Sequence, residues 1–581
     1  MAHRFARAAS FTRHATLVRN CALVGTFGVL SGKSSRCDFT PVPVLVPKVA
    51  APKIIASSAV VAMNDDEEER GIIRRAADKV ASFFKYLYRF LTISAVATPL
   101  TALGPAAYIL GGQIPILEDA AFSYLVWALE KLGPAFVKLG QWASTRPDLY
   151  PPRVIAKLTA LQDNVTSDVS ISEVENTLTD SFGEDWKDKL VLDPKPIGAG
   201  CIAQVYKGVY VDNGIKQDVA VKVIHPHVEE MLKTDMELLA MLTSWLDKIP
   251  SLTNLSLGDS AKSFCTSMTD QIDMKLEASN LILFKRNWQR EDWAIFPEPI
   301  KGMVTKNVLV ETLMEGVGIE KFMNMPHEVD GVVDEKLKKL KSKLSDMGAR
   351  SMIKMIFFDN FIHGDLHPGN VLVTFDKKTN EPKLIFLDCG IVFCNPDKET
   401  HNAVIEICIS FMQHDGRRAA KLMMDHSKNT SNLKVTAADV EAFIEGVHQI
   451  VVDSEEHNYF EHIGEYVMRI CNLARDYHVK LDPGYFRIAM ALKVAEGISL
   501  ALDKKLDMIS KCLPVIVKAK AYQALGIEDF TMSQVAEDLE QTKKELEKQE
   551  ADIRREVKAK KAHADIAIRQ HISEKNGNNN N

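Results

Sequence analysis

The sequence lacks the cysteine pattern of a disulfide-rich or zinc-binding protein. It has nine cysteines, an odd number, and no Cys-x-x-Cys pair, so neither a disulfide framework nor a zinc ribbon is expected. Positive charge is not in excess, because 71 lysines and arginines against 77 aspartates and glutamates give a net charge of −6. That balance argues against nucleic acid as a partner. The 581 residues suffice for roughly two to four domains.

Acidic residues are absent before Asp38, whereas the same stretch carries several arginines, serines and threonines. This composition predicts a transit peptide for a mitochondrion, with a plastid less favoured. The alternative is a disordered basic tail. Residues 41–62 are rich in proline, valine and alanine, and an acidic run follows at residues 65–69. Residues 1–62 are therefore interpreted as transit peptide and linker.

Charge is also absent from residues 90–117, a stretch long enough to span a bilayer. Pro99 and Pro105 weaken it as one straight helix, because proline marks loops as well as membrane helices. Two interpretations stay open, a membrane span and a re-entrant or buried helical hairpin. Either makes residues 63–119 a membrane-associated segment.

The most informative run is Phe-Ile-His-Gly-Asp-Leu-His-Pro-Gly-Asn at residues 361–370, followed by Leu-Asp-Cys-Gly around Asp388. Asp365 is placed to accept or orient the proton of an attacking hydroxyl. Asn370 and Asp388 offer the hard oxygen ligands that Mg²⁺ prefers. Apolar runs on either side of residues 376–382 predict a hairpin with both ligands at its ends. The pattern is typical of a phosphotransferase.

A second cluster lies upstream, at Pro-Ile-Gly-Ala-Gly-Cys-Ile-Ala in residues 196–203. Its small residues would let the backbone approach phosphate oxygens. The expected nucleotide-binding positions are Gly198, Ala199, Gly200 and Ala203. A hairpin turn at residues 212–214 then leads into a returning strand that carries Lys222. Lys222 is expected to contact the α and β phosphates of ATP.

Lys222 requires an acidic partner. A helix predicted over residues 271–280 places Asp273, Glu277 and Asn280 on one face, and Glu277 is the expected ion-pair partner. A strand over residues 308–316 is then expected to run into an interlobe hinge, where backbone groups including those of Glu311 would meet adenine.

An earlier helix contains Lys138 and Gln141, spaced three residues apart and hence on one face. By itself this Lys-x-Gly-Gln pattern is weak, since an exposed lysine beside a polar glutamine is common.

Together these motifs resemble the UbiB family of atypical kinases, also called ADCK proteins, over about residues 120–525. The resemblance implies an α+β fold with two protein-kinase-like lobes, a helical N-terminal extension and a mostly helical C-terminal lobe. It also implies ATP and Mg²⁺ as cofactors and support of coenzyme Q biosynthesis or lipid homeostasis at the mitochondrial inner membrane. The expected parts are an extension at 120–190, an N-lobe at 191–318, a C-lobe at 319–530 and a charged helix with a disordered tail at 531–581.

The resemblance implies roles for individual residues. Catalytic roles fall to Asp365, Lys222 and Glu277, metal binding to Asn370 and Asp388, and regulation by an extension packed over the site to Lys138, Gln141, Gln271 and Asp273. Lys138 is expected to pair with Asp273. The chain departs from the family at Gln271, where glutamate is usual, and at Gly198 and Gly200, where alanine is usual. These changes bear on inhibition and on nucleotide preference.

Other functions stay open beside an ATPase, namely a kinase that phosphorylates a small molecule or a protein hydroxyl and a nucleotide-binding scaffold. Expected partners besides nucleotide are membrane lipids or a quinone precursor, a coenzyme Q biosynthetic complex and a second copy of the chain in a homodimer. From Met532 a seven-residue apolar period runs to Ile553 with polar positions between. A single solvated helix fits this better than a coiled coil. Residues 576–581 are expected to be disordered.

Overall fold

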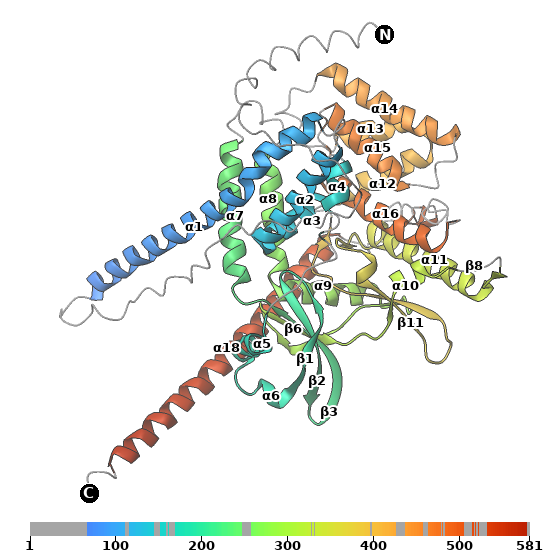
Figure 1. The fold of residues 1–581 in the computed structure, drawn as a ribbon. Helices are drawn as coiled ribbons and strands as arrows, with labels where there is room; N and C mark the ends of the chain where they lie inside the picture. The colour runs from blue at the N-terminus through green and yellow to red at the C-terminus, as the bar shows by residue number, and fades with distance from the viewer. Residues whose placement is uncertain are drawn as a thin grey trace, which may run out of the picture. The chain divides into compact units, whose positions relative to one another are not determined.

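The computed structural model describes residues 67–577 except for 111–114, 145–151, 159–160, 162–168, 247–256, 327, 330–331, 395–397, 426–435, 457–462, 478, 480, 482 and most of 505–531. The chain divides into one unit of residues 1–76 and a second unit of residues 77–581. Helix α1 (Glu67–Leu110) begins in the first unit and continues into the second, which holds the remaining described elements (Figure 1). The predicted transit peptide and linker, residues 1–62, lie outside the described residues.

The second unit contains both helices and strands. Its further α-helices are α2 (Pro115–Leu132), α3 (Pro134–Ser144), α4 (Pro152–Leu158), α5 (Ile171–Phe182), α6 (Trp186–Lys189), α7 (Val228–Leu246), α8 (Leu257–Gln271), α9 (Met274–Asn287), α10 (Ile319–Asn324), α11 (Glu335–Phe357), α12 (Lys398–Met412), α13 (Gly416–Asp425), α14 (Ala437–Glu456), α15 (Ile463–Asp476), α16 (Pro483–Leu502) and α18 (Met532–Gly577). Its strands are β1 (Leu190–Ala199), β2 (Ala203–Asp212), β3 (Ile215–Ile224), β4 (Ala294–Ile295), β5 (Pro299–Val304), β6 (Val308–Thr312), β7 (Val317–Gly318), β8 (Glu328–Val329), β9 (Val332–Val333), β10 (Ile362–His363), β11 (Val371–Phe375), β12 (Pro382–Phe386) and β13 (Val392–Phe393).

The N-lobe is built on a five-stranded antiparallel sheet with the order β1-β2-β3-β6-β5. The hairpin predicted at residues 212–214 joins β2 to β3. Asn213 and Gly214 adopt the positive φ angles of 48° and 82° that a tight two-residue turn requires. Across β3 and β6, Lys222 lies opposite Leu309 and Ala220 lies opposite Glu311.

The C-lobe carries a smaller sheet with the order β4-β12-β11-β7, beside helices α10 to α16. The hairpin predicted around residues 376–382 is β11 paired with β12, in a register that sets Val371 opposite Phe386. A short pair, β10 with β13, sets His363 opposite Val392. β4 joins this sheet parallel to β12, whereas its other pairs are antiparallel. Helices and separate, mostly antiparallel sheets in two lobes confirm the α+β class expected from sequence.

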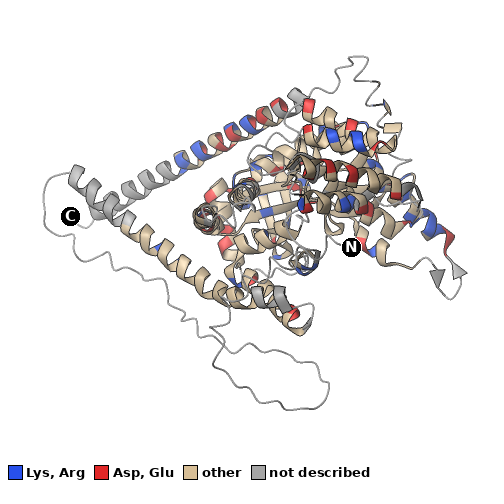
Figure 2. Ribbon diagram, turned by 90° about the horizontal axis from the view of Figure 1, so that it is seen from above, with Lys and Arg blue, Asp and Glu red and all other residues tan. Residues whose placement is uncertain are grey.

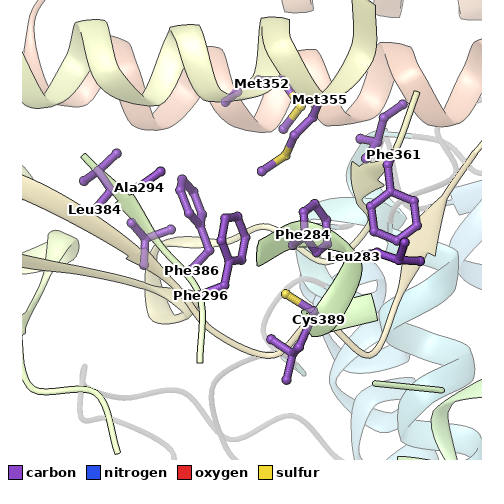
Figure 3. Close-up of a cluster of buried hydrophobic side chains, with 14 of the residues drawn as sticks. Leu283, Phe284, Ala294, Phe296, Met352, Met355, Phe361, Leu384, Phe386 and Cys389 are labelled. Atoms are coloured by element: carbon purple, nitrogen blue, oxygen red, sulfur yellow. The ribbon is translucent and has the colours of Figure 1, made fainter. Parts of the chain in front are cut away.

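The main hydrophobic core joins the two lobes through α9. The ring of Phe284 stacks on Phe296 with centroids 4.9 Å apart and tilts against Phe361 at 4.7 Å. Met352 and Met355 of α11 belong to the same buried cluster (Figure 3). Because α9 is packed into this core, the residues of its first turns are held at a fixed position relative to both lobes.

The C-terminal helix differs from the solvated helix predicted. Figure 2 shows charges of both signs along the described side chains of α18, yet Leu546 is buried in the main core and Leu539 packs against it. Glu550 is buried as well, and it accepts a hydrogen bond from Lys275 of α9. The seven-residue period therefore marks a narrow face that packs on the N-lobe. The helix includes Asn576 and Gly577, and residues 578–581 lie outside the described part.

Helix α1 runs through both Pro99 and Pro105 without interruption. It covers most of the uncharged stretch predicted at residues 90–117, whose residues 111–114 are not described. Among the helices that the structure describes, none combines the length and the apolar character needed to cross a membrane.

Candidate active site

A cavity of about 670 Å³ lies between the two lobes, with α3 contributing to its wall. It brings together almost every site residue predicted from sequence, although these positions are widely separated along the chain. The predicted residues that line it are Lys138, Gln141, Gly198, Ala199, Gly200, Ala203, Lys222, Gln271, Glu277, Glu311, Asp365, Asn370 and Asp388. Asp273 is not part of the lining.

Lys222 contacts two acidic side chains in this cavity. Its Nζ donates to the two carboxylate oxygens of Glu277 at 2.9 and 2.8 Å and to Oδ1 of Asp388 at 3.0 Å. Burial by itself would lower the pKa of Lys222, but the charges of Asp388 and Glu277 raise it above its ordinary value. Lys222 is therefore a permanent cation, and the ion pair predicted between Lys222 and Glu277 is present.

Glu277 is positioned by a helix that starts later than predicted. Helix α8 ends at Gln271, and Asp273 is the N-cap of α9, accepting a hydrogen bond from the backbone N–H of Lys275 at 3.0 Å. A carboxylate at this position satisfies an N–H group that the first turn leaves without a partner. The single helix predicted over residues 271–280 is thus two helices, and Asp273 serves as a cap.

The same helix also reaches the segment that carries Asp388. Nδ2 of Asn280 donates to the carbonyl oxygen of Cys389 at 2.8 Å. One rigid helix therefore fixes Glu277 beside Lys222 and the backbone next to Asp388.

The loop at residues 363–370, which the sequence predicts to be catalytic, is held by its own side chains. Nδ2 of Asn370 donates to the carbonyl oxygen of Asp365 at 3.0 Å, and the N–H of Leu387 donates to the carbonyl oxygen of Asn370 at 2.9 Å. His363 is buried between them, with Nε2 bonded to Leu387 O at 3.0 Å and Nδ1 accepting from the N–H of Asp365 at 3.3 Å. Burial lowers the pKa of His363, so a neutral imidazole holds the loop, as a structural histidine would.

Asp388 occupies an unusual backbone position, with φ at 52°, a conformation that aspartate tolerates better than most residues. Its side chain is 47% exposed. Burial would raise the pKa of Asp388, but the charges of Lys222 and Lys138 hold it well below the usual range. Asp388 is therefore ionised at any physiological pH.

The donor set fits a magnesium ion shared with phosphate. Asn370 donates to the carbonyl oxygen of Asp365 through Nδ2. Oδ1 of Asn370, the oxygen that a metal would use, takes no part in that hydrogen bond. Within the described chain no three histidine, cysteine, aspartate or glutamate residues form a self-sufficient metal site. Mg²⁺ typically takes one or two protein oxygens and completes its shell with phosphates and water, and Asp388 with Asn370 could supply that share.

The small-residue loop between β1 and β2 is closed by His225, a residue that the motifs in the sequence did not identify. The N–H of Gly200 donates to Ala203 O at 2.8 Å, and Nε2 of His225 donates to Gly200 O at 2.8 Å. A Cβ added at Gly198 would come no nearer than 3.9 Å to another atom, and one at Gly200 no nearer than 3.5 Å. Alanine would therefore fit at both positions. The one feature of the sequence that could have identified His225 is its position directly after the strand that carries Lys222.

Helix α3 contributes to the wall of the cavity because Gly140 permits close packing. A Cβ at Gly140 would lie 2.4 Å from Leu161 and 2.9 Å from Leu129. Gln141 donates to the carbonyl oxygen of Leu161 at 2.8 Å. The expected pairing of Lys138 with Asp273 is wrong, since no such ion pair is present between these two described residues. The charge of Lys138 acts instead on Asp388.

Comparison with known proteins relates the sequence to kinase-like proteins. Residues 160–423 match the family described as the ABC1 atypical kinase-like domain. The mitochondrial ABC1 family protein YPL109C of Saccharomyces cerevisiae is 28% identical over 74% of this chain and 74% of its own length. The probable protein kinase UbiB of Cronobacter sakazakii is 29% identical over 67% of this chain and 68% of its own length.

A solved structure, the Rv3197–erythromycin complex from Mycobacterium tuberculosis, is 18% identical and aligns over 67% of this chain and 93% of that chain with a TM-score of 0.41. The matches to the sequence family confirm the resemblance to the UbiB and ADCK proteins.

Proposed function

We propose that this chain, which carries an ABC1 atypical kinase-like domain, binds Mg-ATP in the interlobe cavity and catalyses hydrolysis or transfer of the terminal phosphoryl group. The observation that carries the proposal is the contact of one partly buried lysine, Lys222, with both Glu277 and Asp388. Asp365 and Asn370 line the same cavity. A phosphotransferase needs these groups in one place, since its catalysis is mainly positioning and charge stabilisation.

Each residue has a defined role in this proposal. Lys222, held by Glu277, would bind the α and β phosphates, and Asp365 would orient the attacking hydroxyl or water. Asp388 and Asn370 would hold Mg²⁺, which supplies charge neutralisation on the phosphates when bound. Because Oδ1 of Asp388 lies 3.0 Å from Nζ of Lys222, this carboxylate would hold the metal close to the lysine. Residues Gly198 to Ala203 would cover the phosphates.

Helix α3 supports a regulated site. Lys138 and Gln141 both line the cavity, so access for a protein substrate passes beside this helix. We assign a regulatory role to Lys138, Gln141 and Gln271 of the wall and, through the cap of α9, to Asp273. This arrangement favours an ATPase or a small-molecule kinase over a kinase with an open cleft for peptides.

The physiological role that we propose is support of coenzyme Q biosynthesis or lipid homeostasis in mitochondria. The arginine-rich, acid-free N-terminus and the mitochondrial name of the yeast relative support the location. The similarity to UbiB supports the link to ubiquinone. A quinone precursor or membrane lipid is then the expected substrate or partner, alone or within a biosynthetic complex.

We expect cells that lack this protein to show altered quinones, quinone precursors or phospholipids, measured by mass spectrometry. Wild-type chain should restore the profile. Asp365→Asn should not, because loss of a positioned acid–base group typically costs a factor of about 10² to 10⁴ in rate. Full restoration by Asp365→Asn would favour the nucleotide-binding scaffold, and an unchanged lipid profile in the deleted cells would favour a kinase acting on another hydroxyl compound.

The surface of α1 supports association with a membrane. Large apolar side chains lie three and four residues apart on one exposed face, at Val80, Phe83, Phe84, Leu87, Tyr88 and Leu91. The opposite face is polar and is bound to α7, through Lys85 with Glu230 at 2.6 Å and Arg89 with Asp235 at 2.7 Å. Aromatic side chains on one exposed helix face are typical of segments that lie in the membrane interface. We propose that this face contacts the lipid surface.

The full chain should bind vesicles of phosphatidylcholine, phosphatidylethanolamine and cardiolipin in a sedimentation assay. Phe83→Ser with Phe84→Ser should weaken binding by about 100-fold or more, because a buried phenylalanine contributes about 1.5–3 kcal/mol. Ile215→Ser, which changes an equally exposed apolar residue on the β2–β3 hairpin, should have no effect. Vesicle binding that the double variant leaves unchanged would contradict the proposal. So would a dimer of the wild-type chain that the double variant dissociates, because a second copy would then cover this face.

A further inference from the structure

Glu311 occupies a special place in the cavity wall. It lies on β6, opposite Ala220 of β3, and both residues line the cavity with Leu313 and Met314. Alternation along β6 puts Val308 and Val310 into a separate core cluster behind the sheet. Leu309 belongs to the main core on the other side, and Glu311 faces that same side. Glu311 therefore places an acidic side chain in the cavity wall. The sequence predicts only backbone contacts with the nucleotide at this position.

The carboxyl group of Glu311 has an oxygen with no partner. Its Oε2 is buried and makes no hydrogen bond within the described structure. The nearby ammonium group does not satisfy it, because Lys222 is bonded to Glu277 and Asp388. Burial first, and then the charge of Glu277, raise the pKa of Glu311 to about 8. A buried polar atom without a hydrogen bond is costly, so this oxygen is set up for a ligand.

The surroundings indicate which part of a nucleotide would meet this oxygen. The polar part of the lining includes Lys222, Asp388 and Asn370, whereas a set of apolar side chains in the same lining, called the apolar slot below, suits a flat base. The slot is lined by Ile197, Val205, Ala220, Leu313, Met314 and Leu387.

Two backbone donors at the edge of this slot are already used. The N–H of Thr312 donates to Glu298 O at 2.9 Å, and that of Leu313 donates to Asp218 O at 3.1 Å. Neither N–H group is available for a hydrogen bond to the base in this arrangement. The carboxyl group of Glu311 is therefore a polar group at that edge with hydrogen-bonding capacity to spare.

We propose that the Glu311 side chain selects purine nucleotides with an amino group at position 6 by accepting a hydrogen bond from that group, an inference that rests on the proposed binding of Mg-ATP. At the edge of the base that carries position 6 and N7, a carboxylate can only accept, and a 6-oxo purine presents acceptors there at both O6 and N7. A protonated carboxyl accepts through one oxygen and donates through the other, the same pair of functions with which glutamine binds N6 and N7 of adenine. Both forms of Glu311 favour the amino base.

The test compares ATP with inosine triphosphate, which differs from ATP in carrying a 6-oxo base. Isothermal titration of the full wild-type chain with Mg²⁺ should give about 5- to 100-fold tighter binding of ATP, since one good base contact discriminates by about 1–3 kcal/mol. Glu311→Met, which keeps the length of the side chain and removes both polar atoms, should bring the ratio near one. Glu311→Gln should keep a preference for ATP.

A measurement on the wild type covers the case in which Glu311→Met does not fold. Purine riboside triphosphate, which carries only hydrogen at position 6, should bind about 10-fold more weakly than ATP. Equal binding of these nucleotides by the wild type overturns the inference, as does a ratio that Glu311→Met leaves unchanged. In both cases ATP still binds and the proposed function stands. If no purine nucleotide binds the wild type, the proposed function fails and the inference fails with it.

Discussion

Replacement of Asp388 by asparagine should abolish the stabilisation of this protein by Mg-ATP. A ligand at about 100 times its dissociation constant stabilises the folded state by about 2.7 kcal/mol, which is visible as a shift of the melting temperature. Asparagine cannot supply the anionic oxygen that Mg²⁺ requires, so the shift should fall close to zero. The fold should persist, because asparagine tolerates the left-handed backbone at position 388 (φ 52°).

Asp180→Asn is the matched control, because it makes the same chemical change at an exposed position on α5. It should keep the full response to Mg-ATP. The measurement is a thermal melt with and without Mg²⁺ at fixed ATP. A normal Mg-dependent shift in Asp388→Asn would remove Asp388 from the metal site and with it the proposed arrangement of the cavity.

The second large effect is expected at the C-terminal helix. Glu550 of α18 accepts from Lys275 Nζ at 2.7 Å and from the N–H of Lys306 at 3.3 Å, and the Lys275 side chain is only 11% exposed. Glu550→Ala would leave a buried ammonium group without a partner, which typically costs about 3–5 kcal/mol. Urea unfolding should show this loss in the free energy of unfolding, whereas Glu547→Ala on the exposed side of α18 should change it little.

A double variant separates the ion pair from the packing of α18. Lys275→Met with Glu550→Ala removes both charges, so most of the lost stability should return. If the double variant is as unstable as Glu550→Ala alone, the cost comes from packing around Leu546.

The ion pair also gives a pH dependence. Burial would raise the pKa of Glu550, but the hydrogen bonds from Lys275 and the Lys306 backbone lower it. Its stabilisation is therefore complete above the ordinary pKa of glutamate and is lost as the pH falls through the lowered value.

Helix α18 has a consequence for the active site because Lys275 and Glu277 lie on the first turn of α9. Glu550 anchors one of these residues, and Lys222 binds the other. Loosening of α18 should therefore weaken Mg-ATP binding as well as stability. An unaltered nucleotide response in Glu550→Ala would show that the N-cap at Asp273 and the aromatic core around Phe284 hold α9 in place by themselves.

The sequence alone determined the local features whose physical cause is local. The Asp-Asn-Gly turn at residues 212–214 specifies the β2–β3 hairpin, since only such residues adopt its positive φ angles at low cost. The order of the motifs determined which chemical groups meet, and the predicted contact of Lys222 with Glu277 is present at 2.8 Å. The seven-residue period of α18 predicted a helix correctly, because the spacing of apolar residues within one helix is a property of that helix.

Tertiary structure decided what depends on partners far away in the chain. The sequence predicts a solvated helix for α18 and misses its buried face, because the residue that binds Glu550 is Lys275, 275 positions earlier. Lys138 affects Asp388 instead of Asp273 for a similar reason, since Lys138 and Asp388 line the same cavity and Asp273 does not. The buried oxygen of Glu311 is a property of the cavity, because a glutamate on a strand carries no signal in sequence of whether its surroundings supply a hydrogen-bond partner.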